Sequence, residues 1–198
     1  MMNKKRCNLK NIRYLFIPLV FAALLAACSS DPQNGKEIVP FSYTDQTGKP
    51  FGTDELAGKV WIADFVFTKC KSVCPPMTLE MADLQRKFED EGIQVEFVSF
   101  TVDPTIDTPD LLKEYIHQFT DDETNWHMLT GYTQEEIVFF AREQFQTIVQ
   151  KPSTSNQVIH GTNFYLIDQQ GRIVNEYNYV DASYVKEMTK DIKKIQMQ

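Results

Sequence analysis

Apolar runs alternate with helical patterns along the chain, and this order predicts an α/β fold. Residues 60–67 read VWIADFVF, a nearly continuous apolar run that is typical of a strand buried on both faces. After it, Met77, Leu84 and Phe88 recur at the spacing of one helix face. Because proline is tolerated in the first helical turn, this helix can begin at the Pro-Pro pair before Met77, and we expect it to end before Gly92.

The rest of the chain continues the alternation. The expected strands are 93–102, 126–129, 162–167 and 172–177, and the expected helices are 107–119, 133–145 and 183–195. Residues 38–43, followed by a turn at 46–49, predict a small N-terminal β-hairpin. Residues 147–160 are expected to form an inserted, extended excursion before the late strands, with a turn at 152–156.

Strands and helices in this order favour a central mixed sheet flanked by helices. Two cysteines stand between the first long strand and its helix, and they are followed by a βαβ pattern and then a ββα pattern. This is the thioredoxin-like arrangement. We therefore predict one thioredoxin-like domain over residues 38–198, and the length of the chain gives little reason to expect a second domain.

Residues 1–27 have the features of a secretory signal peptide. A basic stretch without acids is followed by a short apolar run that is too short for a membrane span of roughly 20 residues. The run ends in Leu25-Ala26-Ala27-Cys28, which resembles the lipobox of bacterial lipoproteins, where the cysteine is lipidated after cleavage. Cys28 is therefore the predicted lipid attachment site, and an uncleaved N-terminal anchor is the alternative. Under either interpretation, the protein is tethered to the outer face of the cell membrane.

Residues 28–37 are polar and rich in turn formers, and we expect them to be a flexible membrane tether. The whole chain has a net charge of −7; without residues 1–27 it has 15 basic and 27 acidic side chains, a net charge of −12. Nucleic acid is a poor partner for so acidic a domain. Cys70 and Cys74 are the cysteines left after Cys28, so thiol chemistry in the predicted domain must be theirs.

The stretch FTKCKSVCPPM places Cys70 and Cys74 at the end of an apolar strand, with three residues between them. A helix N-terminus favours thiolate over thiol, and Lys69 and Lys71 would act in the same direction if they lay nearby. Thiolates can attack a disulfide or bind a metal, so the pair alone does not decide between a redox couple and a metal site. A static disulfide is a third reading. A structural zinc site usually needs four protein ligands, and the pair supplies two thiolates.

His160 is the candidate for a third group at the cysteine pair. It precedes the strand at 162–167, whose start faces the dithiol in a thioredoxin-like fold, and redox enzymes of that fold place a cis-proline there. Here the position carries an imidazole and no proline. His117 and His127 are expected to be surface or packing residues. Two thiolates and one imidazole form a soft, incomplete ligand set that suits copper in its +1 state.

Two methionines, Met77 and Met81, could add thioether sulfur to such a set. At helical spacing we expect them to be core residues.

These motifs together resemble the Sco (SCO/SenC) family, named for synthesis of cytochrome c oxidase. They are the CxxxCP motif at Cys70 and Cys74, the sequence VDPTIDTP that contains Asp103, and the late His160. The resemblance covers the region from residue 38 to the C-terminus. It implies a thioredoxin-like protein that binds one copper ion through Cys70, Cys74 and His160. It also places Asp103 near the site, as a second-layer or partner contact, although a structural role at the strand end is an equal alternative.

The resemblance implies two related functions. Family members mature the Cu-A centre in subunit II of cytochrome c oxidase, either as copper chaperones or as thiol reductases that keep exported dithiols reduced. The chaperone role implies a binding protein rather than an enzyme, and the oxidoreductase role is the alternative. Subunit II, the membrane through a lipid anchor and a redox partner for the dithiol are the expected partners. A peroxide-reducing or redox-signalling role is the weakest of the hypotheses.

Overall fold

The structure, a computed structural model, describes residues 35–155 and 157–197. The predicted signal peptide, Cys28 and residues 28–34 of the predicted tether lie outside the described residues. The helices of the described part are α2 (Thr53–Leu56), α3 (Cys74–Asp90), α4 (Pro109–Ile116), α5 (Gln134–Phe145) and α6 (Tyr184–Gln196). Its strands are β1 (Ser42–Thr44), β2 (Pro50–Gly52), β3 (Trp61–Val66), β4 (Glu96–Thr101), β5 (Trp126–Leu129), β6 (Val149–Gln150), β7 (Ile159–His160), β8 (Asn163–Ile167) and β9 (Ile173–Asn178).

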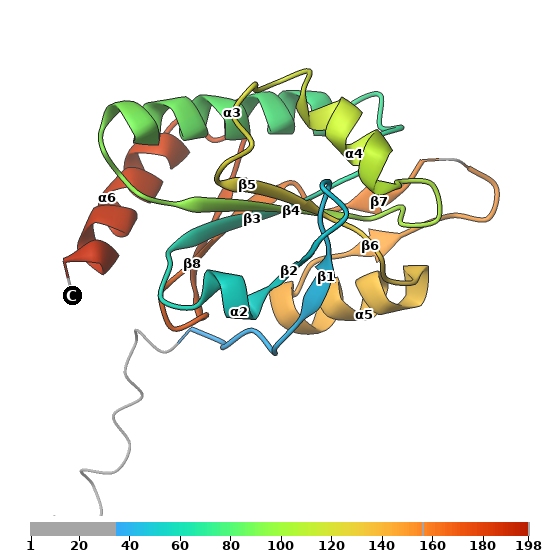
Figure 1. The fold of residues 1–198 in the computed structure, drawn as a ribbon, viewed down its shortest axis with the longest axis horizontal. Helices are drawn as coiled ribbons and strands as arrows, with labels where there is room; N and C mark the ends of the chain where they lie inside the picture. Colours follow the sequence, from blue (N-terminus) through green and yellow to red (C-terminus); the bar gives the residue numbers. More distant parts are fainter. Residues whose placement is uncertain (1–34, 156, 198) are drawn as a thin grey trace, which may run out of the picture. The chain divides into compact units, whose positions relative to one another are not determined.

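Five strands form the central sheet in the order β5-β4-β3-β8-β9 (Figure 1). β3 runs parallel to β4, and β4 runs parallel to β5, so each of these pairs is connected through a helix. β8 is antiparallel to both β3 and β9. The apolar run that predicted the first long strand thus becomes β3, the middle strand, in which every residue is buried. The predicted mixed sheet and thioredoxin-like fold are confirmed.

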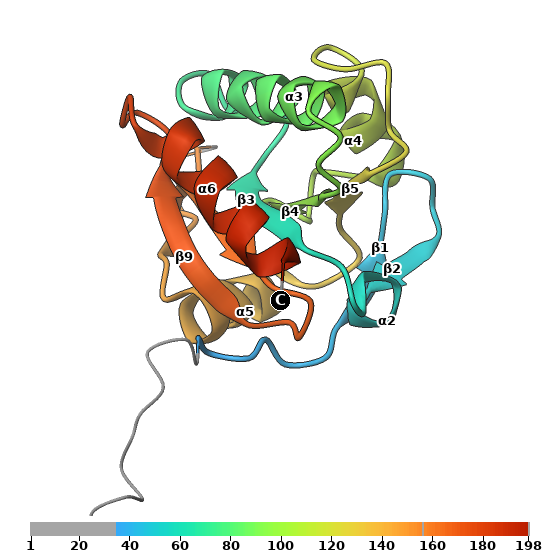
Figure 2. The same ribbon diagram turned by 90° about the vertical axis from the view of Figure 1, so that its left-hand side faces the viewer.

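Helices cover both faces of this sheet (Figures 1 and 2). On one face α3 lies beside α4, where the hydroxyls of Thr78 and Tyr115 are 2.8 Å apart. α3 also contacts α6, because the Tyr184 hydroxyl donates a hydrogen bond to Glu80. On the other face, Phe140 of α5 packs against a ring of β4 with the centroids 5.3 Å apart. The site described below lies at the end of β3 where α3 begins.

The structure differs from the sequence prediction in its shortest elements. The N-terminal hairpin forms around the predicted turn, but its first strand, β1, covers residues 42–44 rather than 38–43, and α2 is a one-turn helix that was not predicted. The excursion at 147–160 contains a two-stranded antiparallel pair, β6 and β7. The missed elements α2, β6 and β7 have two to four residues each, too few to show a hydrophobic period. Among the described helices, none has the length and apolar character that a bilayer span requires.

Candidate metal centre

The two cysteines lie at the junction between β3 and α3. Cys70 is in the connecting loop, where its backbone N–H donates to the carbonyl of Phe67 at 3.2 Å. Cys74 is the first residue of α3, and its N–H donates to the sulfur of Cys70 at 3.3 Å. Val73 precedes the helix without capping it through a side chain, so the Cys70 sulfur accepts one of the N–H groups that a helix start leaves unpaired. Both cysteines are buried free thiols, with 8% of Cys70 and 0% of Cys74 exposed.

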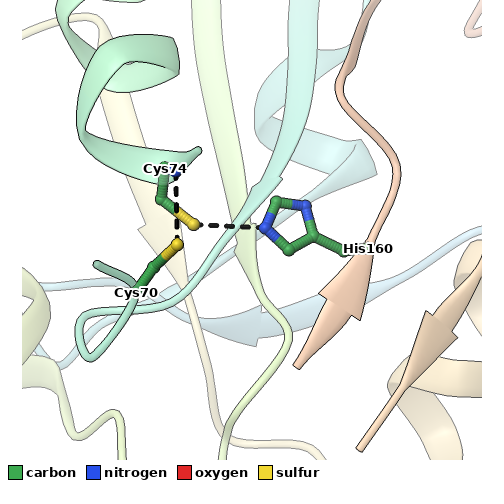
Figure 3. A group of neighbouring side chains, drawn as sticks. All are labelled: Cys70, Cys74 and His160. Carbon is green, nitrogen blue, oxygen red and sulfur yellow. Dashed lines mark hydrogen bonds between the residues drawn. The ribbon is translucent and has the colours of Figure 1, made fainter. Parts of the chain in front are cut away.

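His160 completes a compact group with the two thiols (Figure 3). It belongs to β7, where pairing with Val149 of β6 fixes its backbone. Its Nδ1 lies 2.7 Å from the carbonyl oxygen of Gly161, and its Nε2 lies 3.1 Å from the sulfur of Cys74. A carbonyl only accepts hydrogen bonds, so Nδ1 carries the proton, and in the neutral ring Nε2 keeps its lone pair. The ligand atoms of Cys70, Cys74 and His160 all lie within 4.8 Å of one another.

The two thiols differ strongly in acidity. The hydrogen bond with Cys74 lowers the pKa of Cys70, helped by His160 and by backbone N–H groups and opposed by burial. The same hydrogen bond and burial raise the pKa of Cys74. The metal-free pair therefore holds one thiolate, on Cys70, and one proton, on Cys74. Hydrogen bonds, rather than Lys69 and Lys71, lead the causes of the low pKa.

Alkylation of the reduced, metal-free protein should reveal this asymmetry. We expect iodoacetamide to modify Cys70 before Cys74, because the thiolate is the nucleophile. The rate should change little from about pH 8 down to about pH 5, whereas an ordinary thiol loses roughly tenfold per pH unit below its pKa of about 8.5. Mass spectrometry of peptides identifies the modified cysteine. Modification of Cys74 before Cys70 would contradict this assignment. So would a rate that falls about tenfold for each pH unit as the pH is lowered, as it does for an ordinary thiol.

Asp103 lies at the end of β4 and contacts the excursion that leads to His160. Its Oδ1 accepts hydrogen bonds from Lys151 Nζ at 2.6 Å and from the Thr105 hydroxyl at 2.8 Å. The amide of Gln157 also reaches across, donating to a backbone carbonyl of the cysteine loop at 3.2 Å. Asp103 itself is buried. These contacts link positions 151 and 157 of the excursion to the loops around the site, and Asp103 contacts Lys151 and is not a member of the three-residue group.

The other two histidines lie outside this group. The ring of His127 stacks on Phe51 with the centroids 3.6 Å apart, and Asp45 lies 3.4 Å from its Nδ1. His117 is exposed and contacts Glu123.

The two methionines of α3, Met77 and Met81, are fully buried core residues. In this respect they match the packing role that their helical spacing predicts.

Asp64 is a feature that the sequence reasoning missed. It lies in β3, it is completely buried, and neither carboxylate oxygen has a hydrogen-bonding partner among the described residues. Burial raises its pKa to about 7, while the neighbouring hydroxyl of Ser99 and the field of His160 offset part of the shift. The sequence signal was present, since Asp64 is the one charged residue in the run VWIADFVF.

The fold and the three-residue group define a thioredoxin-like protein with a buried two-thiol, one-imidazole centre. The family model described as SCO1/SenC matches residues 29–196. An SCO1 protein homolog of Bacillus subtilis is 41% identical over 189 residues, which cover 93% of this chain and 97% of the homolog. The chain belongs to the Sco family, which confirms the resemblance seen in the motifs.

Solved structures of Sco proteins share the fold. A SCO1/SenC family lipoprotein of Bacillus anthracis is 47% identical, with a TM-score of 0.80, over 84% of this chain and 98% of that one. BsSco, a family member with an identified disulfide switch, is 42% identical, with a TM-score of 0.76, over 84% and 96%. Copper, the predicted ion, is bound in ScoI of Bradyrhizobium japonicum, which is 27% identical with a TM-score of 0.65 over 82% and 99%.

Proposed function

We propose that this protein binds one copper ion through Cys70, Cys74 and His160 and delivers it to the Cu-A centre of cytochrome c oxidase subunit II. The observation that carries the proposal is the convergence of two sulfurs and one imidazole nitrogen within 4.8 Å of one another. The hydrogen bond from Nδ1 to the carbonyl of Gly161 orients the ring so that its other nitrogen, Nε2, points toward the sulfurs. Outer hydrogen bonds orient metal-binding histidines in the same way. The Sco relatives, described as cytochrome c oxidase assembly proteins, support the same role.

The donor set fits copper better than the commoner metals. Thiolate sulfur is a soft ligand that selects Cu(I) over hard ions, and imidazole is compatible with both copper oxidation states. Zinc in structural sites usually takes four protein ligands, and the group offers three. A three-ligand shell leaves a position at which an acceptor's ligand can enter. The site is therefore suited to a cargo ion that is held and then passed on.

Transfer to an acceptor tests this function directly. Full-length protein in detergent micelles, reduced and loaded with one equivalent of copper, should transfer the ion to the metal-free Cu-A domain of subunit II. The absorption spectrum of the Cu-A centre reports the transfer, and copper analysis of the separated proteins confirms it. The control is the protein with its Cys70–Cys74 pair oxidised to a disulfide, which has lost both thiolate ligands and should carry no copper. Stable retention of copper by the chaperone in the presence of acceptor would contradict the proposal.

A thiol–disulfide oxidoreductase is the second candidate, because the low pKa of Cys70 provides a nucleophilic thiolate. In that role the Cys70 thiolate attacks a disulfide of the partner, and Cys74 then displaces the partner's thiol and closes the Cys70–Cys74 disulfide. Rapid, metal-independent reduction of insulin would favour this role over the chaperone role. Oxidation of the pair to a disulfide would remove both thiolate ligands and so link the two roles. BsSco, in which a disulfide switch is identified, supports a redox change of the dithiol.

The proposal includes a membrane tether. Residues 1–27 would be removed as a signal peptide, Cys28 would carry the lipid, and residues 28–37 would link it to the domain at 38–198. The family relative described as a lipoprotein supports this arrangement. A tether on the outer face would hold the site close to the membrane-bound oxidase and raise the effective concentration of one for the other.

A further inference from the structure

Two segments that build the surroundings of the three-residue group contain no acidic residue. They are residues 65–79, which carry both cysteines, and residues 144–167, which carry His160. The chain as a whole has 27 Asp and Glu residues and a net charge of −7. The two segments are neighbours in space, since the Gln157 side chain donates a hydrogen bond to the carbonyl of Lys69. The acidic surface of the domain is therefore interrupted at the site.

At the site, unpaired positive charge is exposed in place of acidic side chains. Lys69 and Lys71 flank Cys70 in the sequence and are both exposed, and their ammonium groups have no hydrogen-bonding or ion-pair partner within the described residues. Lys151, the other lysine of the two segments, is neutralised by its ion pair with buried Asp103. The exposed charge at the cysteine loop thus comes from two unpaired lysines, on a protein that is acidic overall, whereas Asp107, which accepts hydrogen bonds from Thr68 of this loop, is buried.

Apolar side chains accompany these lysines on the surface. Pro76 and Leu79 are exposed and three residues apart in the first turns of α3, so they lie on the same face of the helix. Ile159, next to His160, is 52% exposed. We use the name "rim" for Lys69, Lys71, Pro76, Leu79 and Ile159. Exposed apolar residues beside unpaired charge, around a site that must meet another protein, are the composition of a docking surface.

We propose that the rim docks a protein partner whose surface, around its own metal-accepting or dithiol group, is acidic. This inference rests on the proposed function, because the partner is the protein that exchanges copper or electrons with the site. An acidic partner is repelled by most of this domain and attracted at the rim, so long-range electrostatics orient the encounter with the two sites facing each other. A basic partner would be attracted everywhere except at the rim, which disfavours productive contact. The lysines thus select both the partner and its orientation.

A charge-reversal pair tests the rim. The double variant Lys69→Glu/Lys71→Glu is compared with Lys186→Glu/Lys190→Glu, which makes the same change in net charge on exposed, unpaired lysines of α6. We expect the rim variant to transfer copper to the Cu-A domain of subunit II about tenfold more slowly at low ionic strength. The α6 variant should stay within about twofold of the wild type. Raising the salt concentration should slow the wild type and reduce the difference between the variants, because exposed charges are screened.

Small disulfides test the charge without copper or a protein partner. The reduced protein reacts with oxidised glutathione, which is anionic, or with cystamine, which is cationic. In each case the Cys70 thiolate displaces one small thiol and Cys74 then displaces the second, leaving the Cys70–Cys74 disulfide. The ratio of the glutathione rate to the cystamine rate should fall about tenfold or more in the rim variant and stay unchanged in the α6 variant.

The outcomes separate the two proposals. Equal transfer rates and equal disulfide ratios for the rim and α6 variants would overturn the docking surface while leaving the copper function in place. If the wild type transfers no copper to subunit II, the proposed function fails, and the disulfide ratio still decides whether the rim selects anionic partners. The copper affinity of the rim variant should remain within about threefold of the wild type, because the variant keeps all three copper ligands. Loss of a ligand would lower the affinity far more.

Discussion

Replacing His160 with alanine should weaken copper binding by at least about 100-fold, because the variant loses one of three ligands. Loss of a residue that merely orients a metal ligand typically costs 10- to 100-fold in affinity, so loss of the ligand itself should cost more. Competition with a chromophoric Cu(I) chelator measures the dissociation constant in the reduced protein. Cys70→Ala and Cys74→Ala should each weaken binding still further, since the thiolates are the softer donors.

The matched control for this variant is His117→Ala. His117 is also a histidine, but it is exposed and contacts Glu123 outside the three-residue group. We expect its copper affinity to stay within about twofold of the wild type. Formation of the Cys70–Cys74 disulfide in His160→Ala, checked by mass, shows that the fold and the dithiol survive the change. Copper affinity within about threefold of the wild type would show that His160 is not a ligand and would refute the three-ligand site.

The longer elements could be predicted from the sequence because each has a regular pattern. The apolar run at 60–67 became the buried middle strand β3, and the apolar spacing after the Pro-Pro pair became α3. The short pair β6–β7 could not be predicted, because its strands have two residues each and form by pairing within an irregular excursion. This pair nevertheless fixes the backbone of His160, so the sequence indicated the residue but not how it is held.

The proximity of His160 to Cys74 depends on contacts between distant parts of the chain. They are 86 residues apart, and antiparallel pairing of β8 with β3 brings the histidine to the dithiol end of the sheet. The sequence could suggest this because the motif order matched a known family. The sequence does not show which ring nitrogen of His160 contacts the carbonyl of Gly161. That contact, which sets the tautomer of the neutral ring, is known from the structure. The same holds for Asp64, whose position in a strand was evident but whose lack of a hydrogen-bonding partner was not.

The second large effect concerns Asp64 and the stability of the metal-free protein. Its pKa is about 7 when folded, against a usual value of 3.8, because burial removes the carboxylate from solvent and the hydroxyl of Ser99 and the field of His160 offset only part of the shift. Below about pH 3 the group is largely protonated in both states and burial carries almost no ionisation penalty. As the pH rises toward 7, the unfolded chain releases the proton while the folded protein retains it, so stability falls. A shift of about 3 pH units corresponds to about 4 kcal/mol of lost stability at and above neutral pH.

Asp64→Asn should remove this loss. Asparagine has nearly the shape of the neutral acid and does not ionise, so the variant should match the wild type near pH 3 and exceed its stability by up to about 4 kcal/mol near pH 8. Guanidinium unfolding of the reduced, metal-free proteins at several pH values measures the difference, in which the titration of all other groups largely cancels. Asp90→Asn, at an exposed carboxyl, should differ from the wild type by less than about 0.5 kcal/mol throughout. Parallel stability curves for Asp64→Asn and the wild type would mean that the buried carboxyl titrates normally, as it would if water reached it.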